Sequence, residues 1–93
     1  MRQIIGYQNA RMIGIRVKPR WLASATAVSL VANGGTGQVI LSIPLATIET
    51  WRDLDQAVHR VIKTGYSVAD FMTALDEGFK LRHGKPVKAV LHS

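Results

Sequence analysis

The chain contains no cysteine among its 93 residues. This absence excludes a disulfide framework, a thiol nucleophile and any zinc site built on cysteine ligands. Proline and aromatic residues are also scarce, with three prolines and 6% Phe, Trp and Tyr. The 47% hydrophobic and 19% charged residues are typical of one small globular domain rather than of a disordered chain.

Long hydrophobic runs are absent as well. The longest weakly polar stretch, residues 22–32, is far shorter than the roughly 20 apolar residues that a membrane-spanning helix needs. The same stretch starts too late and holds too many small side chains to serve as a secretory signal. We therefore expect a soluble, cytoplasmic protein with no membrane partner.

Acidic residues are missing from the first 48 positions, although five Lys and Arg residues lie there. All six acids fall within residues 49–77, and residues 78–93 are basic again, which leaves a formal net charge of +6. A segregated excess of positive charge favours polyanionic partners, but it does not determine a fold.

The first half of the chain has the period of β-strands. Apolar and non-apolar residues alternate over 13–18, which predicts a half-buried strand, with residues 4–7 as its partner. Pro19 is expected to end that strand because it has no N–H for the ladder. Residues 26–31 and 38–43 predict a second pair of strands, joined by the glycine-rich stretch 33–37 as a hairpin. A phosphate-binding loop is not predicted there, because a strand rather than a helix follows the glycines.

A helix is predicted to begin after Thr50. Thr50 and Asp53 have the spacing of a capping box, and Gly65 suits the left-handed residue that ends a helix. The apolar residues between them recur at helical spacing and are expected to face the core. They are Trp51, Leu54, Val58, Val61 and Ile62.

A second helix is predicted between Ser67 and Gly84, with Pro86 just beyond its end. Gly78 is expected to weaken this helix by about 1 kcal/mol relative to Ala. Residues 87–91 form either a last short strand or a tail. The apolar residues expected to face the core are Val68, Phe71, Met72, Leu75 and Phe79.

These elements predict an α+β fold in a single domain, residues 1–93. An antiparallel sheet of about four strands occupies the strand-rich basic half, 1–48, and a helical hairpin, 49–83, covers one of its faces. A basic tail, 84–93, follows. We expect the uncovered sheet face to carry Arg16, Lys18 and Arg20.

The candidate binding residues are basic side chains and one tryptophan. A row of cations on one strand face suits the phosphates of a nucleic-acid backbone. Trp21 either stacks on a base or, as we favour, packs in the core. Lys80 and Arg82 either contact a partner or complement the dipole at the end of a helix. The full set is Arg11, Arg16, Lys18, Arg20, Trp21, Lys80, Arg82, Lys85 and Lys88.

No catalytic or metal-binding constellation is evident. Asp53 and Asp55 point to different sides of a helix, so they cannot act as a carboxylate pair. His83 and His92 have no partner at the spacing of metal ligands. The sequence also carries no helix-turn-helix, zinc-finger, ribonucleoprotein or cold-shock signature. We expect a protein that is not an enzyme and that needs no cofactor or metal.

Two function classes fit these observations. The first is a small basic protein that docks on nucleic acid or a nucleoprotein complex through its basic strand face. The second is a phage- or plasmid-encoded inhibitor or adaptor, of the anti-CRISPR type, that occupies a surface of a host protein or nucleoprotein complex. Either one is compatible with a homodimer.

Overall fold

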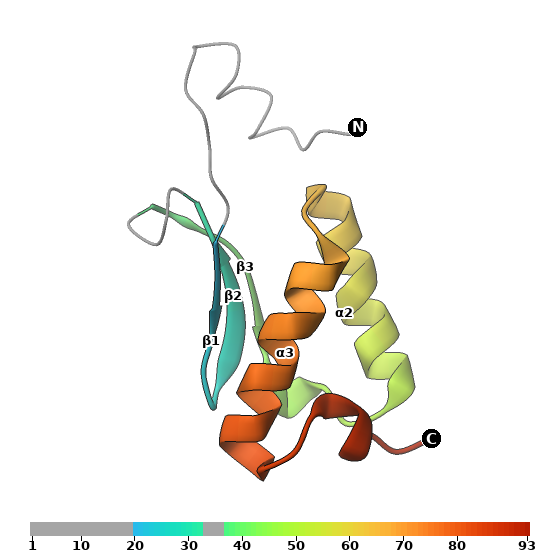
Figure 1. Cartoon of the computed structure of the whole chain (residues 1–93). Coiled ribbons are helices and arrows are strands. Elements are labelled where there is room, and N and C mark those ends of the chain that lie inside the picture. The colour runs from blue at the N-terminus through green and yellow to red at the C-terminus, as the bar shows by residue number, and fades with distance from the viewer. Residues whose placement is uncertain (1–19, 33–36) are drawn as a thin grey trace, which may run out of the picture.

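The computed structural model describes residues 20–32 and 37–93, and this part of the chain has an α+β fold (Figure 1). A three-stranded antiparallel sheet of order β1-β2-β3 precedes two helices. The elements are β1 (Arg20–Ala23), β2 (Ala27–Val31), β3 (Val39–Pro44), α2 (Trp51–Thr64) and α3 (Val68–His83), with short 3₁₀ helices η2 (Leu45–Thr47) and η3 (Val87–Ala89).

The strand count differs slightly from the sequence prediction of about four. The strands predicted over 4–7 and 13–18 lie outside the described residues. Strand β1, which begins directly after position 19, was not predicted, because its alternation is short and places Leu22 on the exposed side. The described sheet is therefore built from β1 and the predicted pair, β2 and β3.

The pairing of β2 with β3 confirms the predicted antiparallel strands. Val28 lies opposite Ile43, and Ser29 lies opposite Ser42. Val28 and Ile43 are buried beneath the helices, whereas the hydroxyl oxygens of Ser29 and Ser42 are 3.1 Å apart on the other face. The register shifts between Leu30 and Val31, so the regular alternation of faces is interrupted at that end of the hairpin.

Helix α2 begins with the predicted capping box. The Thr50 hydroxyl accepts a hydrogen bond from the Asp53 N–H at 3.2 Å, and the Asp53 carboxylate accepts one from the Thr50 N–H at 3.0 Å. Gly65 ends the helix in the left-handed conformation with φ 83°. Both predicted ends of α2 are thus confirmed.

The predicted core face of α2 is only partly correct. Leu54 and Val61 are buried, but Trp51 and Ile62 remain 44% and 53% exposed. Ala57, which was not predicted, is buried instead. Helix α2 packs on α3 at the side of the sheet (Figure 1), so only part of its wide apolar arc is covered.

Helix α3 lies centrally over β1 and β2. Its side chains Phe71, Leu75 and Phe79 are completely buried, and the ring of Trp21 on β1 packs against Phe71 with centroids 5.5 Å apart. Val68 and Met72, also predicted for the core, are half-buried and pack against it.

Gly78 allows α3 to approach the end of β1 closely. A Cβ at this position would lie 2.9 Å from the Ser24 carbonyl oxygen and 3.0 Å from a methyl group of Leu45. The sequence predicted that Gly78 weakens the helix. In the folded protein the missing side chain is what permits the helix and the strand end to pack.

The C-terminal residues fold back beside the start of α2. Val87 is buried, and its N–H donates to the Asp76 carboxylate at 3.1 Å. His92 then forms an isolated parallel bridge with Thr50, in which the His92 N–H bonds to the Glu49 carbonyl at 3.1 Å. Residues 87–91, predicted as a strand or a tail, are thus a 3₁₀ turn leading to this bridge. No helix in the described ranges is long and apolar enough to cross a membrane.

Candidate binding surfaces

Four exposed cations lie within residues 80–88, around the end of α3, and we call Lys80, Arg82, Lys85 and Lys88 the basic end. Gly84 closes α3 in the left-handed conformation with φ 79°. The chain then turns through Pro86 and inserts Val87 into the core. Because Val87 is anchored, the lysines on either side of it are held at the surface.

Arg82 also has a structural role within the basic end. One guanidinium nitrogen donates to the Ala25 carbonyl oxygen at 3.0 Å, which ties the β1–β2 turn to the end of α3. A guanidinium has five N–H donors. The bond to Ala25 therefore leaves Arg82 with donors for a phosphate or carboxylate group.

The basic strand face predicted from the sequence is visible only at Arg20. Arg11, Arg16 and Lys18 lie outside the described residues. On the described part of the uncovered sheet face, Leu22 is 48% exposed and lies in register with Ser29 and Ser42. Val39 and Ile40, at the irregular end of β3, are 54% and 41% exposed.

Arg20 and the basic end lie at opposite ends of β1. Arg20 pairs with Val31 at the start of the strand, whereas Arg82 contacts the turn at Ala25. Strand β1 spans Arg20–Ala23, and three steps of about 3.3 Å each place its two ends roughly 10 Å apart. Trp21 is half-buried and packs against the core. The six predicted residues that the structure describes therefore do not lie on one surface.

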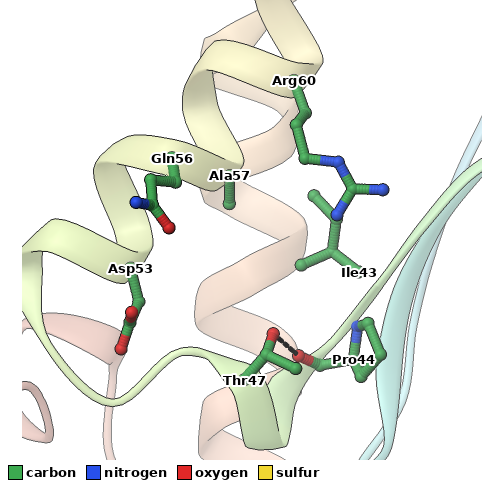
Figure 2. A pocket seen from close by; sticks show the side chains of 7 residues that line it. All are labelled: Ile43, Pro44, Thr47, Asp53, Gln56, Ala57 and Arg60. Carbon is green, nitrogen blue, oxygen red and sulfur yellow. Dashed lines mark hydrogen bonds between the residues drawn. The ribbon is translucent and has the colours of Figure 1, made fainter.

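A groove separates α2 from the edge of β3 (Figure 2). We call it the α2–β3 groove; its cavity volume is about 190 Å³. Strand β3 and η2 contribute one wall and α2 the other, so residues far apart in the sequence meet there. The lining residues are Ile43, Pro44, Thr47, Asp53, Gln56, Ala57 and Arg60.

Some polar groups of the α2–β3 groove already form hydrogen bonds within the protein. The Asp53 carboxylate accepts from the N–H groups of Glu49 and Thr50, and these bonds, that from Glu49 foremost, lower its pKa. The Thr47 hydroxyl donates to the Pro44 carbonyl oxygen at 2.6 Å. Gln56 and Arg60 lie one helical turn apart and both reach into the groove (Figure 2). Sequence analysis did not identify this site, because neither wall carries a recognisable motif.

A second pocket, of about 320 Å³, lies near the C-terminus. Its lining includes Glu49, His83 and His92 and the apolar residues Leu45 and Ile48. The His83 ring packs on the core side chain Phe79, with centroids 5.3 Å apart. Within residues 20–32 and 37–93, no three acidic or histidine side chains are grouped so that they could hold a metal ion.

Comparison of the chain with protein-family models, curated proteins and solved structures finds no match.

Proposed function

We propose that this chain is a small non-enzymatic protein that docks on nucleic acid, or on a nucleoprotein complex, through its basic side chains. The observation that carries the proposal is the basic end, where four exposed cations occupy a segment without any acidic residue. Contacts of Lys and Arg with phosphates supply most of the sequence-independent affinity of such proteins.

The anchoring of Val87 supports this proposal. Lys85 and Lys88 flank a buried side chain whose N–H is itself held by Asp76. Fixing the backbone between two lysines reduces the conformational entropy that binding would otherwise have to remove. The sequence alone adds Arg11, Arg16 and Lys18 as proposed contacts. Arg20, at the other end of β1 from the basic end, would belong to a separate contact.

The experiment is a salt titration of binding to fluorescent 20-nucleotide RNA and DNA probes, single- and double-stranded. We expect the logarithm of the affinity to fall linearly with the logarithm of salt concentration, with a slope of about 0.7 to 0.9 per phosphate neutralised. Replacing Lys85 and Lys88 together by Ala should flatten this slope by about 1.5. A matched control replaces Arg52 and Lys63, two exposed cations of α2, and should change the slope less.

Absence of binding to every probe at about 50 mM salt, where non-specific electrostatic affinity is strong, would overturn direct nucleic-acid binding. Equal effects of the two double variants would instead show that net charge matters and that the basic end is not a site. Thermal unfolding of each variant verifies that the fold is retained.

The second candidate function is an inhibitor or adaptor of the kind that phages and plasmids encode. It is favoured by the exposed apolar side chains of the sheet, Leu22 on the strand of Arg20 and Val39 and Ile40 on β3, since exposed apolar side chains near polar ones are typical of protein interfaces. Such a protein should bind one host complex tightly at moderate salt, and Arg20→Ala should reduce that affinity more than loss of a lysine does. Mass spectrometry and nucleic-acid sequencing of co-purifying material would separate the two candidates.

A further inference from the structure

Strand β3 forms one edge of the described sheet, where it pairs with β2 alone. The Leu45 N–H donates to the Thr26 carbonyl at 2.9 Å, so Thr26 and Leu45 are a hydrogen-bonded pair of the antiparallel β2–β3 ladder. Such pairs alternate with non-hydrogen-bonded ones. Ser29 and Ser42, three positions further along, are therefore a non-hydrogen-bonded pair.

The backbone N–H and C=O of Ser42 consequently point away from β2, toward the edge of the sheet. The same alternation places Pro44 opposite Ala27 at a position where no ladder N–H is required. Pro44 has no N–H to offer at the edge, so pairing with another strand would end there. The edge groups that remain lie along residues 40–43.

Helix α2 stands beside this edge, separated from it by the α2–β3 groove (Figure 2). Ile43 and Ala57 give the groove apolar walls, and Gln56 and Arg60 add polar groups. On a strand added to β3, the inner-face side chain opposite Ile43 would enter this groove, because Ile43 itself lines it.

The charges of the groove determine what kind of side chain it suits. Asp53 is the one acidic residue of the lining, and its carboxylate is bound to two backbone N–H groups. Arg60 is exposed and lies two helical turns from Asp53 on α2. A carboxylate entering the groove at the Arg60 end would meet the guanidinium and the amide of Gln56, whereas Asp53 lies at the other end, bound to two backbone N–H groups (Figure 2).

We propose that the α2–β3 groove binds an extended peptide segment of a partner protein, which adds a strand to β3 along residues 40–43 and places an acidic side chain against Arg60. Backbone bonds to an edge strand supply affinity in this mode of recognition, and the side-chain pocket supplies specificity. The proposal concerns a surface and a partner class different from those of the basic end.

The experiment is selection of random decapeptides displayed on phage against the immobilised full-length protein, followed by calorimetry with the enriched peptides. We expect an enriched set with an Asp or Glu at one fixed position. Ser42→Pro removes the edge N–H without removing a β2–β3 hydrogen bond, and should weaken binding about tenfold. Ser42→Ala keeps the N–H but loses the same hydroxyl contact with Ser29, so it is the matched control and should bind nearly as the natural protein does.

A second variant tests the acidic side chain independently of strand pairing. Arg60→Gln should weaken binding about fivefold, and it should abolish the difference between the selected peptide and a version with Gln in place of its acid. Lys63→Gln, on the same helix and outside the groove lining, is the control.

The proposal is overturned if no peptide is enriched, or if enriched peptides bind the Arg60→Gln and Lys63→Gln variants equally well. Equal binding by the Ser42→Pro and Ser42→Ala variants overturns it as well, where thermal unfolding shows that both variants are folded. Should Ser42→Pro not fold, the double-mutant comparison of Arg60→Gln with the Gln-containing peptide decides the matter.

Discussion

Asp53 shows how much one short side chain contributes at the start of α2. Its carboxylate accepts hydrogen bonds from two backbone N–H groups, which hold its pKa below the ordinary value. A carboxyl group whose pKa is lower in the folded chain than in the unfolded one stabilises the fold above the unfolded pKa, about 3.9. That contribution is lost as the pH falls through the folded value.

We therefore expect Asp53→Asn to lower the melting temperature by a few degrees at pH 7, with the difference shrinking below about pH 4. Circular dichroism at pH 7, 5, 3 and 2 measures this. Asp55→Asn removes an exposed charge from the same turn of α2 and should show a smaller change. A decrease in the melting temperature of Asp53→Asn that is equally large at pH 7 and pH 2 would contradict the capping explanation.

Gly78 provides a second test at the scale of one residue. Alanine is the better helix former by about 1 kcal/mol, but its Cβ would press on the Ser24 backbone oxygen and on Leu45. Overpacking of this kind costs about 1–3 kcal/mol, so we expect Gly78→Ala to reduce the free energy of unfolding by about 1 kcal/mol in urea denaturation. A stabilised Gly78→Ala protein would mean that α3 can move away from β1 without loss.

At the scale of the element, the two helices differ in how they use apolar residues. Phe71 on α3 is completely buried, whereas Trp51 on α2 is 44% exposed. We expect Phe71→Ala to cost about 3–5 kcal/mol of unfolding free energy, and Trp51→Ala to cost clearly less in the same denaturation experiment. Similar losses for the two variants would indicate that Trp51 is covered in solution, as in a homodimer.

The helix ends could be predicted from the sequence because capping is local. Thr50, Asp53, Gly65, Ser67 and Gly84 each act within a few residues of their own position. Burial of a helix face is not local. The apolar arc of α2 includes both Trp51 and Val61, and only the placement of α2 at the side of the sheet exposes the first and buries the second.

At the scale of the whole molecule, the order of charges along the chain could be predicted but not their places in space. The basic end was identified residue by residue, since its members are close in sequence. Its separation from Arg20 follows from the direction of β1 and from the bond between Arg82 and Ala25. The α2–β3 groove was missed for the same reason, because Ile43 and Arg60 meet only through tertiary packing.

The bridge between His92 and Thr50 joins the last residues to the first turn of α2. Because the Trp51 N–H donates to the His92 carbonyl at 3.2 Å, the start of α2 is not exposed to fraying on its own. The amide hydrogens of Trp51 and His92 should therefore exchange with deuterium through the same opening event. The amide of His92 would then report on the stability of a helix that begins some 40 positions earlier in the sequence.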